Sequence, residues 1–167
     1  IKHQKAANDA KKSKVFGKLV RFITVEAKKA GGNLRSPGLS LAIEKAKKEN
    51  MPNDTIDRAI KKATTDNSAA MENITYESYG PGGVAILIEA LTDNRNKAAQ
   101  EVKAILARHG SELASQGSAS WAFTKGPEGL VASTTIPLED SDIEKLQLLV
   151  EELEENDEVQ DVFTNAE

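Results

Sequence analysis

The sequence contains no cysteine among its 167 residues. This absence excludes disulfides, thiolate catalysis and cysteine-based zinc sites. Aromatic residues make up only 4% of the chain, and no apolar run approaches the roughly 20 residues that a membrane-spanning helix needs. The first residues, Ile1-Lys2-His3-Gln4-Lys5, are polar and do not form the apolar part of a secretory signal. Together these absences predict a cytoplasmic protein that has no membrane partner.

The length and the first residue set the expected size of the protein. A chain of 167 residues, 39% of them hydrophobic, can form one or two modest domains with a real core. Because the chain begins with isoleucine, we expect a fragment, a processed product or an ordered part of a longer protein.

Charge is distributed very unevenly along the chain. Residues 1–64 hold 16 Lys/Arg and 6 Asp/Glu, residues 65–133 hold 5 and 8, and residues 134–167 hold 1 and 12. The net charges of +10, −3 and −11 give the −4 of the whole chain. A segment this basic predicts a polyanionic partner such as nucleic acid. The alternative is that the two ends of the chain neutralise each other within the fold.

The basic segment has the pattern of three amphipathic helices, which predicts a helical domain over residues 1–64. The first helix should span about 11–30 and end at Gly31-Gly32. The second should start at Ser36-Pro37, an N-cap followed by proline, and the third at Asn53 or Asp54. At 100° per residue, the first helix places its lysines and arginine opposite an apolar stripe. The stripe consists of Phe16, Leu19, Val20, Ile23 and Ala27.

After a polar stretch at 64–73, the pattern changes to a mixture of strands and helices, which predicts an α+β fold. Helices are expected over 94–109 and after Ser141, where Ser141-x-x-Glu144 matches a capping box. The expected strands are 76–79, 84–91, 118–123, 130–132, 134–138 and 159–164. The glycines of Gly80-Pro81-Gly82-Gly83 predict a turn with positive φ. A phosphate-binding loop is not expected, because the segment lacks the residue spacing of such loops. Backbone amides offered to RNA or to a protein partner are the alternative role.

Few side chains are suited to catalysis or metal binding. His3 and His109 are far apart in sequence and have no cysteine near them, so no metal site is expected, and no nucleophile elbow occurs. Asp93 or Asn94 should cap the helix that follows. Arg95, in the first turn of that helix, gains nothing from the helix dipole and is a candidate for an external contact. We therefore expect neither an enzyme nor a cofactor nor a small-molecule substrate.

Six segments in the same order along the chain resemble the YebC family. Members of that family are described as probable transcriptional regulatory proteins, and one member is the mitochondrial translational activator of cytochrome c oxidase subunit I. An organellar member would reside in the mitochondrial matrix. The matching segments are Ile1-Lys2-His3-Gln4-Lys5 with Asp9-Ala10-Lys11-Lys12-Ser13-Lys14; Asn50-Met51-Pro52 with Ile56-Asp57-Arg58-Ala59-Ile60-Lys61-Lys62; Tyr79-Gly80-Pro81-Gly82-Gly83; Leu91-Thr92-Asp93-Asn94-Arg95-Asn96; Thr134-Thr135-Ile136-Pro137-Leu138; and Asp157-Glu158-Val159-Gln160-Asp161-Val162.

The resemblance implies a three-domain α+β protein. It consists of an N-terminal three-helix domain followed by two ferredoxin-like α/β domains, of which the last is incomplete here. The expected boundaries are 1–64, 74–133 and 134–167. Family members also carry a short segment before Ile1 and roughly 60 further residues before Thr134, which would form most of a domain. We therefore predict that this sequence is interrupted between Val131 and Thr134, where the native protein would carry further residues.

The combined observations predict a nucleic-acid-binding regulator of gene expression. The first hypothesis is a transcriptional regulator that binds DNA through the basic helical face. The alternatives are a translation factor that binds ribosomal or messenger RNA and a protein-interaction module that docks through the acidic tail. No helix-turn-helix signature or interleaved aromatic base reader is found. The expected nucleic-acid-binding residues are Lys2, His3, Lys5, Lys11, Lys12, Lys14, Lys18, Arg21, Lys28 and Arg95.

Overall fold

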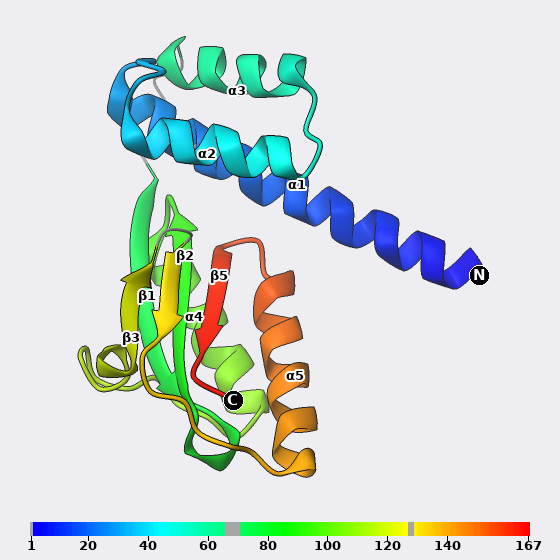
Figure 1. Ribbon diagram of the computed structural model, residues 1–167, viewed down its shortest axis with the longest axis vertical. Helices are drawn as coiled ribbons and strands as arrows, with labels where there is room; N and C mark the ends of the chain where they lie inside the picture. Colours follow the sequence, from blue (N-terminus) through cyan, green and yellow to red (C-terminus); the bar gives the residue numbers. More distant parts are fainter. Residues whose placement is uncertain (1, 66–70, 127–128) are drawn as a thin grey trace. The chain divides into compact units, whose positions relative to one another are not determined.

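The computed structural model describes residues 2–65, 71–126 and 129–167 (Figure 1). The chain divides into two compact units, Ile1–Met71 and Glu72–Glu167. The first unit is helical, and the second combines antiparallel sheets with helices. This arrangement confirms the α+β class.

Unit 1 consists of α1 (Lys2–Ala30), α2 (Pro37–Lys48) and α3 (Asn53–Thr65). The two shorter helices pack against α1, whose N-terminal turns extend beyond them (Figure 1). Small alanines at the contacts allow the helices to approach closely. The buried residues of this core are Ile23, Ala27, Leu39, Ala42, Ala46, Met51, Ile56, Ala59 and Ala63.

The ends of the helices in unit 1 agree with the sequence signals except at the start of α1. Gly31 and Gly32 have φ of 60° and 82°, and the Gly32 amide donates to the carbonyl of Ala27 at 3.0 Å, so the expected glycine stop is confirmed. Helix α1 begins at Lys2 rather than near residue 11. The expected start followed the apolar stripe, whereas residues 2–10 contain three Ala and two Lys, which favour helix without any stripe.

Unit 2 is built on a three-stranded antiparallel sheet in the order β1-β2-β5. The strands are β1 (Glu72–Tyr79), β2 (Ala85–Thr92) and β5 (Val159–Thr164). Helices α4 (Arg95–Arg108) and α5 (Asp140–Glu155) cover one face of the sheet (Figure 1). A hairpin of β3 (Phe123–Gly126) and β4 (Gly129–Ala132) packs on the opposite face.

Strand β2 is buried on both faces, which explains its nearly continuous apolar sequence. Val84, just before it, and Ile86 and Ile88 belong to the cluster with α4 and α5. Ala85 and Leu87 belong to the cluster with the hairpin. Because successive strand residues face opposite sides, one short run of sequence supplies both cores.

Two expected strands take other forms. Residues 118–123 were expected to be extended, but Ser120–Ala122 form a 3-10 helix and β3 starts at Phe123. The cause is the carboxylate of Glu77, which accepts the backbone N–H groups of Gly117, Ala119 and Ser120. Residues 134–138 form only one isolated bridge, between Ile136 and Ala166, because Pro137 has no N–H to extend a ladder.

The C-terminal segment belongs to the same compact unit as the middle of the chain, although a boundary was expected at residue 134. Strand β5 pairs with β2, and α5 buries Leu146, Leu149 and Leu153 in the shared core. Helix α5 starts at Asp140 with Glu139 as N-cap and no capping side-chain bond, so the capping box at Ser141 is not formed. The predicted break between Val131 and Thr134 stays a prediction.

Candidate nucleic-acid interface

The division of charge follows the division into compact units. Unit 1 holds 16 Lys/Arg against 7 Asp/Glu, and unit 2 holds 6 against 19. The resulting net charges, +9 and −13, give the −4 of the whole chain. The excess positive charge is therefore confined to the helical unit.

Helix α1 separates most of its apolar residues from its basic residues, but the buried Val25 lies on the basic side. Ile23 and Ala27 are fully buried in the core of unit 1. Lys14, about half a turn away from this stripe, is exposed, while three further cations are half-buried: Lys18, Arg21 and Lys28. For five further expected contact residues the structure describes only the helical backbone of α1 and not the side chains. These residues are Lys2, His3, Lys5, Lys11 and Lys12.

Helix α3 presents a second basic face that the sequence analysis did not single out. Arg58, Lys61 and Lys62 are exposed and share one side of the helix through three- and four-residue spacing. The opposite side carries Ile56 and the alanines that are buried against the other helices. The charge total of residues 1–64 included these cations, and the apolar spacing of α3 already implied that they face outward.

Helix α2 adds cations near its C-terminus, where they are favoured by the helix dipole. Lys45 places its Nζ 5.4 Å from the centre of the Phe22 ring, a cation–π contact that links α2 to α1. Lys47 and Lys48, in the same last turn, are exposed. Unit 1 therefore displays positive charge from each of its three helices.

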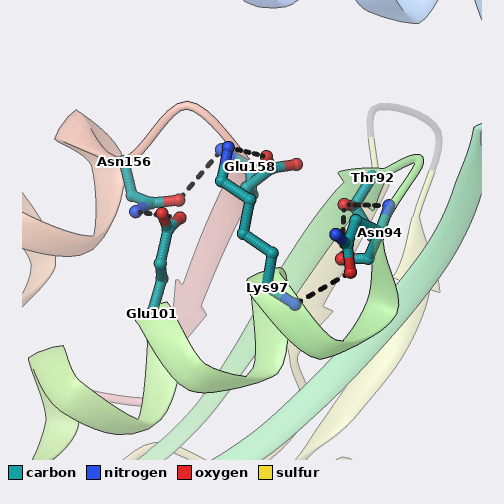
Figure 2. Close-up of polar contacts among 6 residues, drawn as sticks. All are labelled: Thr92, Asn94, Lys97, Glu101, Asn156 and Glu158. Carbon is teal, nitrogen blue, oxygen red and sulfur yellow. Dashed lines mark hydrogen bonds and ion pairs between the residues drawn. The ribbon is translucent and has the colours of Figure 1, made fainter.

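The expected contact residue Arg95 is the first residue of α4 in unit 2. Figure 2 shows the cap of this helix. Asn94 is the N-cap of α4, and its side chain accepts from the Lys97 amide at 3.1 Å. The hydroxyl of Thr92 accepts from the amide of Asn94 and donates to its carbonyl, both at 2.9 Å. The capping role expected for Asn94 is confirmed. Arg95 itself pairs with Glu72 of β1, at 3.1 Å between Nε and Oε2.

Neighbouring polar residues connect α4 to the turn between α5 and β5 (Figure 2). Lys97 Nζ lies 3.5 Å from a carboxylate oxygen of the buried Glu158. Asn156 donates from its side-chain amide to Glu101 at 3.0 Å and accepts from the Glu158 backbone amide at 2.9 Å. Because Lys97 compensates a buried carboxylate, its role is structural.

His109 is engaged in a structural contact at the C-terminal end of α4. Its Nε2 lies 2.5 Å from Oε2 of Glu152 on α5, and Arg108 Nε donates to the other carboxylate oxygen at 2.8 Å. Hydrogen bonds from Arg108 and His109 lower the pKa of Glu152. These contacts hold α4 and α5 together on the sheet.

Glu77 on β1 anchors the segment that precedes β3. The residue is 5% exposed, and its carboxylate accepts the backbone N–H groups of Gly117, Ala119 and Ser120 at 2.6, 2.9 and 2.7 Å. Burial raises the pKa of Glu77, but these three hydrogen bonds outweigh it, and the net shift is downward. No local sequence pattern indicated this cluster, since the partners lie about 40 residues away from Glu77.

The described residues contain no group of three or more His, Asp or Glu side chains arranged to hold a metal ion. Among the helices that the structure describes, none combines the length and apolar character required to cross a bilayer.

Comparison with known proteins gives matches along most of the chain. Residues 1–66 match the family described as "TACO1/YebC protein N-terminal domain", and residues 71–127 match "TACO1/YebC second and third domain". A probable transcriptional regulatory protein of Petrotoga mobilis is 46% identical over 175 residues, which cover 100% of this chain and 68% of the relative. A protein of the same name from Fervidobacterium nodosum is 46% identical over 162 residues, covering 95% of this chain and 64% of the relative.

A relative in Thermotoga maritima, also named a probable transcriptional regulatory protein, is 49% identical over 127 residues, which cover 75% of this chain and 50% of the relative. The chain thus spans about half to two thirds of the length of these relatives. Among solved structures, a conserved hypothetical protein from Aquifex aeolicus is similar, with a TM-score of 0.81 and 30% sequence identity. That match covers 95% of this chain and 91% of the Aquifex chain.

Proposed function

The chain belongs to the TACO1/YebC family, and from this membership we propose that it is a regulator of gene expression that binds nucleic acid through phosphate contacts of unit 1. The observation that carries the proposal is the net charge of +9 within one compact helical unit. The relatives named probable transcriptional regulatory proteins support a regulatory role. DNA is the first expected target, and ribosomal or messenger RNA is the alternative.

The proposed interface consists of exposed and half-buried basic residues of two helices. On α1 these are Lys14, Lys18, Arg21 and Lys28, and on α3 they are Arg58, Lys61 and Lys62. Lysine and arginine that neutralise phosphates release condensed counterions, so affinity falls steeply with salt and carries no sequence information. Binding of this kind suits a protein that recognises a general phosphate surface rather than a particular base sequence.

The test measures how affinity depends on salt with a pair of matched variants. Fluorescence anisotropy would compare duplex DNA with duplex RNA of the same sequence for the wild type and for Lys61→Gln with Lys62→Gln. Loss of two phosphate contacts should reduce the slope of log K against log salt by about 1.8 and weaken binding about 60-fold at roughly 0.1 M salt.

The control variant, Lys103→Gln with Lys145→Gln, removes the same charge from exposed helical positions of unit 2. It should leave the slope unchanged. If both variants lose affinity equally, overall charge rather than unit 1 determines binding, and the proposed interface is wrong. Comparing retention by ribosomes with retention by promoter DNA at matched salt would then separate the RNA target from the DNA target.

A further inference from the structure

Unit 2 carries two exposed aromatic side chains on the hairpin side of its sheet. Trp121 is the single tryptophan of the chain and is 58% exposed, and Tyr79 is 39% exposed. Of the other large apolar side chains on this side, Leu87 and Phe123 are buried in the core, whereas Val131 of β4 is 53% exposed. An aromatic pair left in solvent loses the stabilisation that burial would supply, so its exposure calls for another explanation.

Hydrogen bonds fix the two rings in place. The indole N–H of Trp121 donates to the hydroxyl oxygen of Tyr79 at 3.3 Å, and the Tyr79 hydroxyl donates to the carbonyl of Ser118. The carboxylate of Glu77, two residues before Tyr79 on the same strand, holds the amides of Gly117, Ala119 and Ser120. The segment that carries Trp121 is therefore tied to β1 on both sides of Ser118. Rings held in this way lose little conformational entropy when a ligand binds.

The chemistry around the rings is neutral and polar. Residues 113–126 contain one charged side chain, Lys125, whereas Ser115, Gln116 and Ser120 are exposed. Because the indole N–H already has a partner within the protein, the exposed part of Trp121 offers aromatic ring surface rather than a free hydrogen-bond donor. A site with so little positive charge does not neutralise phosphates. Stacking of a base on an aromatic ring does not require positive charge at the site.

The exposed area limits the kind of partner. At 58% and 39% exposure, two aromatic side chains of about 150–250 Å² each offer roughly 200 Å². A stable protein interface buries about 800 Å² per partner, so the pair is too small to serve as one by itself. A single flat ring is the ligand that fits such a surface.

We infer that Tyr79 and Trp121 form a stacking platform for an unpaired base of single-stranded nucleic acid. The inference rests on the proposed function, since unit 1 supplies the phosphate attraction that a platform with one neighbouring cation lacks. Stacking on an aromatic ring tolerates every base, so the platform adds a preference for unpaired strands without adding sequence specificity. Unit 2 would then also bind nucleic acid, although its net charge is negative.

The test uses the single tryptophan as its own probe. A single-stranded RNA of about 15 nucleotides should quench Trp121 fluorescence and protect the indole from acrylamide. A hairpin duplex of similar length that binds equally well by anisotropy should do neither. Trp121→Ala should weaken single-strand binding about 5- to 150-fold, the equivalent of one stacked base, and leave duplex binding unchanged.

Leu148→Ala is the matched control, because Leu148 is a large exposed side chain, at 60%, on α5 and away from the platform. It should change neither kind of binding. If wild-type protein binds both RNAs but shows no quenching, and Trp121→Ala keeps the same preference between them, the platform is refuted and the proposed function stands. If neither RNA nor duplex DNA binds at low salt, the proposed function fails as well.

Discussion

Replacing each of the two glycines in the turn between β1 and β2 should separate backbone strain from steric overlap. Gly82 and Gly83 have φ of 72° and 83°, a region that costs other residues about 1–2 kcal/mol. A Cβ on Gly83 would meet nothing within 4 Å, whereas one on Gly82 would lie 2.5 Å from Leu138 Cδ2 and 3.1 Å from an Asp142 carboxylate oxygen. Leu138 cannot simply move aside, because it packs against the core beneath α5.

We therefore expect Gly83→Ala to lower the free energy of unfolding by about 1 kcal/mol through backbone strain alone. Gly82→Ala should lower it by about 2–4 kcal/mol, because overpacking adds a further 1–3 kcal/mol. Urea unfolding followed by Trp121 fluorescence is the assay. The signal reports on unit 2, since that unit holds the only tryptophan of the chain.

Gly110→Ala provides the control for strain, because Gly110 also has positive φ, at 73°, and open space around it. It should behave like Gly83→Ala, with an unchanged dependence on urea. Equal destabilisation by Gly82→Ala and Gly83→Ala would refute the reasoning, since it would mean that the contact with Leu138 carries no cost.

Three further outcomes are expected. Lys14→Glu combined with Lys18→Glu and Arg21→Glu should weaken nucleic-acid binding at least about 500-fold at roughly 0.1 M salt, as expected for three lost phosphate contacts; an unchanged affinity in a variant with wild-type circular dichroism would remove α1 from the interface. Because the pKa of Glu77 is lower in the folded protein than in the unfolded chain, the ionised carboxylate stabilises the fold at pH values above the ordinary glutamate pKa. This stabilisation should be lost as the pH falls through the pKa of Glu77 in the folded protein. Glu77→Gln should lack that part of the pH dependence in urea unfolding, and an identical pH profile would contradict the assignment. Asn94→Ala should cost about 1 kcal/mol by removing the helix cap and Asn94→Gly only a few tenths, which thermal melting can distinguish.

Local patterns predicted the parts of the fold that depend on neighbours in sequence. Apolar spacing located β2 and the helices, apart from the first turns of α1, and the paired glycines located the end of α1. Asn94 is one of the two residues that were expected to cap α4. The basic face of α1 followed from the same spacing. The exposed cations of α3 were counted but not singled out, although their helix was expected.

Features that depend on distant residues could not be read from the sequence. The 3-10 helix at Ser120–Ala122 exists because Glu77 binds amides about 40 positions away. The contact between Tyr79 and Trp121 joins a strand to a segment 42 residues later, so the scarcity of aromatics gave no hint that two of them lie together. Likewise, the buried charge of Glu158 acquires its partner Lys97 only through the fold. Periodicity carries no information about such pairs.

The separation of charge between the two units has a consequence for handling the protein. The sequence pI of 5.4 suggests a molecule that binds only to anion exchangers at neutral pH. Net charges of +9 and −13 on separate compact bodies instead make the protein zwitterionic on the scale of whole units. It should be retained by both quaternary-amine and heparin columns from the same buffer, because each resin meets the unit of opposite sign.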